Sequence, residues 1–541
     1  MNRPLLLILV TFVVLGAVYS LTTPIFEAPD EIEHYFYIKH IADEWRLPVQ
    51  DPENVGPWGQ EGGQPPLFYA LGALITFWID SSDASELVRY NPHANVGLAL
   101  AHGNKNVIIH TDREAFPYRG TVLALHLARL LSILLGAAAV LATYLIALEI
   151  FPARRDIALG SAAINAFIPQ FLFSSGVVSN DVTVAALAGW ALLLMARLIT
   201  RGLSGRRLVT LGVILGLAAL AKLSGLGLIA LTVAVLTGLA LQRRDASVLL
   251  KGGLIVLGLA TLMAGWWYVR NALLYGDPLG LKIFLGIVSR RDTFSWRALW
   301  NEFEGIRISF WALFGWFNVP IEPFVYRLYD GLSLAGLLGL IWLVVKHRWK
   351  QFDRKPAPPD CKSGKSEGEG ASEEERPHLL AILALWLLIT FLSLVQWTWL
   401  TTGSQGRLLF PAVSALSVLL AAGLAQLAPR RCAPWLLGLV GGAMAVMALL
   451  APFLYIAPAY ARPPILSPEE VPAQIHRLDV SYGGEMKLLG YELGGERVRR
   501  GEYLTLTLYW QSLALMERDY SVYIHLFGRE GQPVGEEDNY P

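Results

Sequence analysis

Apolar runs of about 20 residues recur along this chain, and they limit its fold more than any other feature of the sequence. A helix of that length can cross the hydrocarbon core of a bilayer, because it satisfies its backbone polar groups within its own segment. Hydrophobic residues make up 54% of the 541 residues, more than is usual in soluble domains. We therefore predict an all-α polytopic membrane protein.

The first apolar run, residues 5–21, follows Arg3 and could be taken for a signal peptide. No small-residue cleavage pattern comes after it, which favours an uncleaved helix with its N-terminus in the cytoplasm. The run 208–241 is long enough for two short helices. With these, we expect about eleven spans in total. The other runs are 121–150, 157–178, 182–199, 248–269, 328–345, 379–395, 408–427 and 435–456.

Positive charge between the runs sets the expected orientation, since short loops rich in Arg and Lys stay in the cytoplasm. Such charges occur at 154–155, 201–207, 243–244, 346–355 and 430–431. Segment 66–79 is apolar but only about two-thirds of a spanning length, and a crossing there would move every later Arg-rich loop outside. We therefore expect it to be an interfacial or re-entrant helix within one large outer loop, residues 22–120.

Two segments depart from this composition. Residues 346–377, rich in Pro, Gly, Ser and charge, are typical of a disordered cytoplasmic linker within a transmembrane domain of residues 1–460. In residues 464–541, alternating runs separated by glycine-containing turns predict a small β-sandwich-like domain outside the membrane. The predicted strands stop at Pro541, too soon for a complete sandwich, which suggests a truncated domain.

The densest polar cluster directly follows the first apolar run. Asp30 and His34 are four positions apart and share a face if the segment is helical, with Glu31 beside them. One interpretation is a solvated acidic first turn that complements the helix dipole. The alternative is a reactive site, which is favoured because these side chains stand where apolar helices meet the outer surface.

Further ionisable residues occur at the predicted outer ends of other helices, namely Asp181, Lys222, Arg270 and Arg407. Most have an ordinary explanation of their own, such as a helix N-cap, a snorkelling side chain or an interfacial belt. An Arg at a helix start outside the membrane nevertheless runs against the charge bias. Together with the first cluster, they predict two acidic centres and three basic ones on one face of the membrane.

This combination suits a reaction of a lipid-linked phosphosugar, whose phosphate lies at the membrane interface. Arg and Lys would hold the phosphate and stabilise it as a leaving group. Because phosphate leaves without protonation, one carboxylate acting as general base on the acceptor hydroxyl would suffice. A second carboxylate would position the acceptor or bind a divalent ion.

Net charge and cysteine content exclude several other classes. Lys and Arg number 44, as do Asp and Glu, so no overall field would attract nucleic acid. Cys361 and Cys432 lack the spacing of a metal knuckle or a redox pair, and both fall in predicted cytoplasmic loops. A disulfide framework is therefore excluded.

Several short motifs follow one another along residues 1–460. They are Ala28-Pro29-Asp30-Glu31 with His34, Gln64-Pro65-Pro66-Leu67-Phe68-Tyr69, Ser179-Asn180-Asp181, Ala221-Lys222, Trp267-Tyr268-Val269-Arg270-Asn271 with Tyr275-Gly276-Asp277-Pro278, and Gln405-Gly406-Arg407-Leu408-Leu409-Phe410-Pro411. This order resembles the GT-C superfamily of integral-membrane glycosyltransferases. The match is closest to the bacterial branch near the protein mannosyltransferase-like enzymes of family 39 and to relatives with a PDE…H opening.

The resemblance implies a GT-C-like fold and inverting transfer from a polyprenyl-phosphate sugar to a glycan, lipid or protein acceptor on the outer face. By position, Asp30 matches the catalytic carboxylate, with Glu31 and His34 as its neighbours. Asp181 matches the second acidic site. Arg270 and Arg407 match basic residues near the lipid phosphate. Metal dependence varies within the superfamily, so the resemblance leaves the metal unknown.

These observations give each residue an expected role. Asp30 is the base, and His34 orients it. Glu31 and Asp181 position the acceptor or an ion. Arg270 and Arg407 hold the phosphate, and Lys222 is a further phosphate ligand.

Other functions share part of this pattern. A transporter or flippase should carry its ionisable residues near the bilayer midplane and show repeated halves, whereas here the charges lie at helix ends and no inverted repeat is visible. A ligase that uses a polyprenyl-diphosphate glycan would need most of the same charged residues at the outer surface, so this alternative is not excluded. A non-catalytic scaffold is a further alternative. The transferase is the function that we predict.

Overall fold

The computed structural model describes residues 3–539 except 98, 100–104, 289, 292, 294, 353–374, 496, 498, 500–503 and 517–519. The described chain divides into two compact units. The first runs to Tyr460, and the second consists mainly of Ala461–Pro541. Each unit is described by itself.

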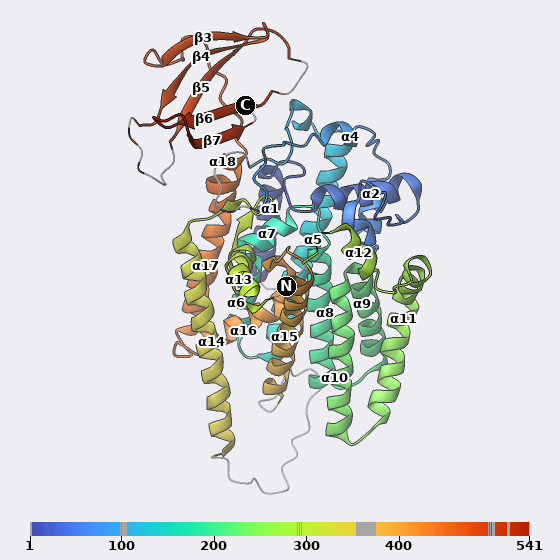
Figure 1. Ribbon diagram of the computed structural model, residues 1–541. Coiled ribbons are helices and arrows are strands. Elements are labelled where there is room, and N and C mark those ends of the chain that lie inside the picture. Colours follow the sequence, from blue (N-terminus) through green and yellow to red (C-terminus); the bar gives the residue numbers. More distant parts are fainter. Residues whose placement is uncertain are drawn as a thin grey trace. The chain divides into compact units, whose positions relative to one another are not determined.

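The first unit is helical, and its described part contains 9 helices that are long and apolar enough to cross a membrane. Its long helices run side by side (Figure 1). They are α1 (Arg3–Thr22), α5 (Gly120–Ile150), α8 (Asp181–Thr200), η3 (Leu223–Gly225) with α10 (Leu226–Arg243), α11 (Ser247–Tyr275), α14 (Pro323–Phe352), α15 (Arg376–Leu400), η4 (Gly406–Ala412) with α16 (Val413–Leu424), and α17 (Ala433–Ala451) with η5 (Pro452–Ile456) and α18 (Ala457–Ala459). The predicted polytopic, all-α membrane class is confirmed.

The predicted span at 157–178 is not one straight helix. It consists of α6 (Arg155–Ala166) and α7 (Pro169–Ser175), bent by 62° at the break between them. Pro169 opens α7, where its missing N–H costs nothing, and it disfavours a helical residue before it. The predicted eleven spans are reached only if this bent pair and the 17-residue helix α9 (Gly205–Ala221) both cross.

The first loop, residues 22–120, folds into short elements: α2 (Glu31–Glu44), η1 (Gly59–Gly63), α3 (Leu67–Thr76), α4 (Ala84–Leu87) and η2 (Asp112–Glu114). Helix α3 has 10 residues, too few to cross a bilayer, in keeping with the short apolar helix expected at 66–79. Later segments add α12 (Leu281–Ile287), α13 (Trp296–Trp311), β1 (Leu313–Phe314) and β2 (Val319–Pro320). Helices α2, α4 and α12 lie at one end of the bundle, called the loop end below (Figure 1).

The predicted linker is shorter than residues 346–377. Helix α14 continues to Phe352 and α15 begins at Arg376, so both ends of the expected linker are helical. Lys, Arg and Gln are good helix formers, which explains why charge alone does not end α14. Residues 353–374, with Cys361, lie outside the described part of the chain.

The second unit is made of strands. β3 (His476–Tyr482), β4 (Met486–Leu493) and β5 (Leu506–Ser512) form an antiparallel sheet in the order β3-β4-β5. β6 (Val522–Phe527) and β7 (Pro533–Asn539) form an antiparallel hairpin. Gly483 and Gly484 both have positive φ in the turn between β3 and β4, as a tight glycine turn requires. The expected β region at the C-terminal end is confirmed.

Candidate active site

Asp30 immediately precedes α2 in a left-handed backbone conformation, with φ 63° and ψ 6°. Few residues other than Gly adopt this region, and Asp and Asn tolerate it best. The helix begins at Glu31, so Pro29 precedes it. The Asp30 carboxylate makes no capping hydrogen bond. Instead it accepts from Gln60 Nε2 at 3.1 Å and from Arg407, and so it faces other segments of the chain.

Arg407 joins the two acidic centres. Its guanidinium pairs with Asp30, and its Nη1 lies 3.7 Å from Asp181 Oδ2. The preceding Gly406 packs directly on α13, where a Cβ would lie 2.2 Å from the carbonyl oxygen of Ile306. Only glycine permits this approach. Its N–H also donates to Ser309 Oγ at 2.8 Å, which fixes the start of η4 and with it the Arg407 side chain.

Asp181 and Lys222 form the second ion pair of the site. Asp181 is the first residue of α8, and Lys222 is extended between α9 and η3, with its ammonium donating to the Asp181 carboxylate. Gly225 lets the chain turn back here, because a Cβ would lie 2.2 Å from the carbonyl oxygen of Ala218. Residues from four distant segments thus meet at one point.

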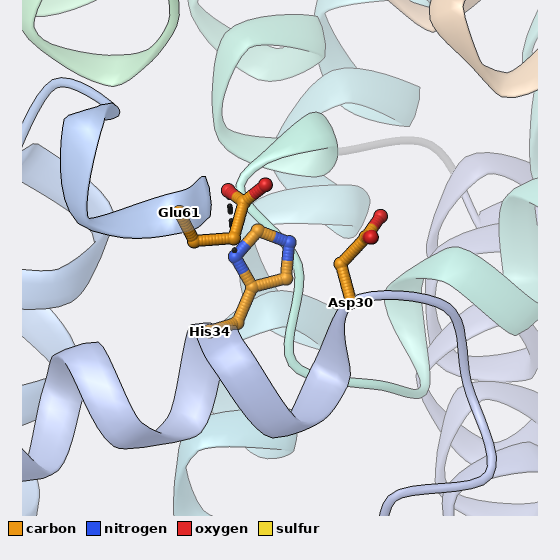
Figure 2. Close-up of side chains that lie close together, drawn as sticks. All are labelled: Asp30, His34 and Glu61. Carbon is orange, nitrogen blue, oxygen red and sulfur yellow. Dashed lines mark ion pairs between the residues drawn. The ribbon is translucent and has the colours of Figure 1, made fainter. Parts of the chain in front are cut away.

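His34 belongs to a second, buried network beside Asp30. Its Nδ1 lies 2.9 Å from the Tyr69 hydroxyl and 3.3 Å from Glu61 Oε2. The Tyr69 hydroxyl donates to Glu61 Oε2 at 2.9 Å and accepts from Asn180 Nδ2 at 3.2 Å. Figure 2 shows His34 and Asp30 rising from the same helix start, with Glu61 above the imidazole ring.

A cavity of about 530 Å³ opens onto these residues. Its polar part includes Asp30, Glu61, Asp181, Lys222 and Arg407. The rest is largely apolar and aromatic, with Trp267, Leu281, Phe284, Leu394, Trp397, Leu400 and Leu408 among its lining residues. An amphiphilic ligand with a charged head and an apolar tail would match this division.

Burial and neighbouring charges separate the pKa values of the first-loop groups. Burial alone would raise the pKa of Asp30, but the positive charges of Arg407 and Lys222 outweigh burial and hold it below its usual value. Burial, with the Asp30 charge, raises the pKa of Glu61 to about 8. Burial lowers the pKa of His34 to about 3, so the imidazole is neutral. Asp30 is therefore ionised at neutral pH and Glu61 largely protonated.

Comparison with known proteins decides the family. The model of a family described as "Predicted membrane protein (DUF2142)" matches residues 121–416, more than half of the 541 residues. The chain belongs to this family. No curated protein matches this DUF2142 member at a significant level.

Several solved structures are similar to the chain at low identity. ArnT from Cupriavidus metallidurans in the apo state is 17% identical with a TM-score of 0.48, over 83% of this chain and 64% of that one. The same protein bound to undecaprenyl phosphate is 15% identical with a TM-score of 0.41, over 83% of this chain and 65% of that one. The Archaeoglobus fulgidus oligosaccharyltransferase complex with Zn and sulfate is 14% identical with a TM-score of 0.39, over 84% of this chain and 52% of that one. The chain thus spans less than two-thirds of the length of each.

Glu31 does not share the cavity with Asp30. Its carboxylate is fully buried and forms a bidentate pair with Arg129 of α5, at 2.8 and 2.7 Å. It also accepts the backbone N–H groups of Phe26 and Val178. With four donors already bound, this carboxylate has no capacity left for an acceptor or an ion. The geometry therefore indicates a structural role for Glu31 and not the positioning role expected from the sequence.

Arg270 also lies apart from the two ion pairs. It donates to the carbonyl oxygen of Pro48 at 2.6 Å and stands over the Trp267 ring at 5.1 Å, and it is not among the residues that line the cavity. Its expected role as a phosphate ligand finds no support in this geometry. It holds the first loop against α11, while Trp267, one turn earlier, reaches the cavity.

Sequence reasoning missed Glu61 and Gln60. Both lie in the turn η1, in a Gly- and Gln-rich segment that reads as an ordinary loop. A single carboxylate between two aromatic residues, Trp58 and Tyr69, was the available signal. It is weak, because nothing in the spacing indicates that η1 folds back onto the start of α2.

His110 ties the far end of the first loop to its beginning. Its Nε2 lies 3.0 Å from Glu27 Oε1 and its Nδ1 2.9 Å from Glu114 Oε2. Both ring nitrogens donate only when the imidazole is protonated. Burial would lower the pKa of His110, but hydrogen bonds to Glu114 and Glu27 outweigh burial and raise it to about 9. The contact is therefore an ion pair at neutral pH.

We expect the stabilisation from His110 to disappear as pH rises. The folded-state pKa of about 9 exceeds the unfolded value of about 6.5, so the folded protein binds more protons between these values. The contribution is complete below about pH 6.5 and lost by about pH 9. His110→Gln should therefore cost on the order of 2 kcal/mol at pH 6, and much less at pH 9.5, in thermal melts of the detergent-solubilised protein. Equal losses at both pH values would show that the proton contributes nothing.

Proposed function

We propose that this DUF2142 protein transfers a sugar from a polyprenyl-phosphate donor to an acceptor hydroxyl at the outer face of the cytoplasmic membrane. One observation carries the proposal. In the cavity, Asp30 pairs with Arg407 and Asp181 pairs with Lys222, and both pairs stand at the polar part of a largely apolar space. A phosphate and a prenyl chain are the two chemical parts that such a cavity would accommodate.

Donor binding would rearrange these ion pairs. The donor phosphate diester is an anion with oxygen acceptors, so it would compete with the carboxylates for the guanidinium of Arg407 and the ammonium of Lys222. Asp30 would then lose its principal cationic partner. A carboxylate freed in this way is a stronger base, because the neighbouring positive charge no longer stabilises its ionised form.

The reaction is a single displacement. The acceptor oxygen forms a bond to the anomeric carbon while the bond from that carbon to the phosphate oxygen breaks, and the configuration inverts. The acceptor proton passes to Asp30, and the leaving group is the polyprenyl phosphate. Arg407 and Lys222 would stabilise the charge that develops on the leaving phosphate, which needs no proton.

The proposal includes an orientation of the helices in the membrane. Arg201 follows α8 and Arg244 follows α10, each at the end of the helix that lies away from Asp181 and Lys222. These Arg-rich loops therefore stand at the opposite end of the helices from the cavity. By the positive-inside rule, we propose that the loop end lies outside and the N-terminus in the cytoplasm. We propose an extracytoplasmic position for residues 464–541 on the same grounds.

Transfer of label tests the proposed function. Membranes that express the wild-type protein or Arg407→Ala should be supplied with radiolabelled polyprenyl-phosphate sugars. We expect wild-type membranes to move label into an acceptor fraction and Arg407→Ala to lose at least about 100-fold in rate, as for other removed oxyanion ligands. Transfer from polyprenyl-diphosphate glycans alone would instead favour a ligase. An absence of transfer from any donor would contradict the transferase.

A further inference from the structure

The hydrogen bonds around Tyr69 determine which nitrogen of His34 carries the proton. Tyr69 gives its single hydroxyl proton to Glu61, so its oxygen acts as an acceptor toward His34 and Asn180. The neutral imidazole must therefore donate from Nδ1, which lies 2.9 Å from that oxygen. The lone pair of the ring is then on Nε2, the nitrogen that a metal ion would use.

Nε2 of His34 has no hydrogen-bond partner among the described residues, although the side chain is only 4% exposed. Figure 2 shows this nitrogen turned toward the side on which Asp30 lies. Glu61 repeats the pattern, since Oε2 accepts from Tyr69 while no described residue donates to Oε1. Two buried groups thus keep an unused lone pair beside a third ligand, the Asp30 carboxylate.

We propose that Asp30, His34 and Glu61 bind one divalent metal ion at the inner end of the first loop. One ligand atom from each residue lies within 4.8 Å of the other two. Two ligands of a tetrahedral Zn²⁺, at about 2.1 Å from the ion, lie about 3.4 Å apart. The ligand atoms would therefore approach one another by about an ångström to share one Zn²⁺.

A bound donor would favour a cation here. At neutral pH the carboxylates of Asp30 and Asp181 balance the cations Lys222 and Arg407 of the cavity lining, because Glu61 is largely protonated. A phosphate diester would add one negative charge, and a metal that displaced the proton of Glu61 would add a second. One divalent ion balances both charges, and it would leave Arg407 and Lys222 free to hold the phosphate.

The donor set also selects the kind of metal. One imidazole nitrogen with two carboxylate oxygens suits Zn²⁺ or Mn²⁺, whereas Mg²⁺ and Ca²⁺ prefer oxygen ligands alone. Tyr69 and Asn180 would act behind these ligands, because hydrogen bonds to the outer atoms of ligands hold them in the geometry that a metal needs. This inference deepens the proposed function and rests on it only for the phosphate. A carboxylate has two oxygens, so Asp30 would bind the ion through one and keep the other for the acceptor proton.

Binding of Zn²⁺ alone tests the site, with no donor present. The purified full chain in detergent would be treated with a chelator, dialysed and titrated with Zn²⁺ by calorimetry. We expect one equivalent to bind to the wild type, and Glu61→Gln and His34→Gln each to weaken binding by at least about tenfold. Glu61→Gln keeps the shape of the side chain and an acceptor for Tyr69, so it should fold even if His34→Gln does not. Asp43→Asn, which removes an exposed carboxylate from the same helix, should bind as the wild type does.

Two results would overturn the metal site. The first is a wild-type protein that takes up no Zn²⁺. The second is a Glu61→Gln protein that binds Zn²⁺ as tightly as the wild type. Because the titration contains no sugar donor, either result is independent of the transfer assay, and a failed transfer assay would leave the binding result standing.

Discussion

Replacing Asp30 with Asn should lower the rate of sugar transfer by about 10²- to 10⁴-fold, the range for loss of a general base. The amide cannot accept the acceptor proton. Asn also tolerates the left-handed backbone of this position, so the start of α2 should keep its conformation. The measurement is the initial rate in membranes at equal protein level and neutral pH, where Asp30 of the wild type is ionised.

Asp43→Asn is the matched control for this variant. Asp43 stands on the same helix but is half-exposed and pairs with Lys39 at 2.7 Å, away from the cavity. Its replacement should leave the transfer rate within about twofold, since exposed ion pairs contribute little. Wild-type rates in Asp30→Asn would remove this carboxylate from the chemistry. A raised KM with unchanged kcat would assign it to donor binding, through Arg407, and not to proton transfer.

Replacing Glu31 with Gln should unfold much of the protein, at a cost of about 3–5 kcal/mol. Arg129 and Glu31 are both fully buried, and the variant would leave the guanidinium without a counter-charge. Arg129 also donates to the carbonyl oxygens of Ser20, Thr23 and Pro24, which end α1 and begin the first loop. The measurement is the fraction of protein that stays monodisperse after detergent extraction, together with its melting temperature.

Glu86→Gln is the control for the buried pair. Glu86 forms an exposed ion pair with Arg113, with side chains 63% and 65% exposed, so its loss should change stability by less than about 1 kcal/mol. The double variant Glu31→Gln with Arg129→Met should recover part of the lost stability, because it removes the uncompensated charge. A Glu31→Gln protein that is as stable as the wild type but inactive would return this residue to a catalytic role.

The membrane spans were predictable because their signal is local. Each long apolar run can cross the bilayer as one helix that satisfies its own backbone hydrogen bonds. Its position along the chain can therefore be predicted without knowing its neighbours in the fold. The bent pair α6–α7 departs from this rule at Pro169, where the backbone and not the hydropathy decides. Asp181 and Lys222 were likewise predictable from their positions at helix ends, because ionised side chains are costly inside a bilayer and rarely occur there without a function.

The partners of these charges were not predictable from position along the chain. Asp30 and Glu31 are neighbours in sequence, yet one faces Arg407 across the cavity and the other faces Arg129 inside the fold. Two consecutive residues at the start of a helix direct their side chains to different sides. The left-handed backbone of Asp30 therefore gives Asp30 and Glu31 different surroundings. Glu61 was missed for the same reason, because its nearness to His34 depends on how η1 folds back.

The sequence alone therefore determined that this is a polytopic membrane protein, where most of its helices lie, and which end of them carries charged side chains. These properties follow from hydropathy and from charge at segment ends, which act within about 20 residues of chain. Only the tertiary structure decided which carboxylate meets which cation. An ion pair joins residues as distant as 30 and 407, and its energy depends on separation and burial, which no local pattern encodes.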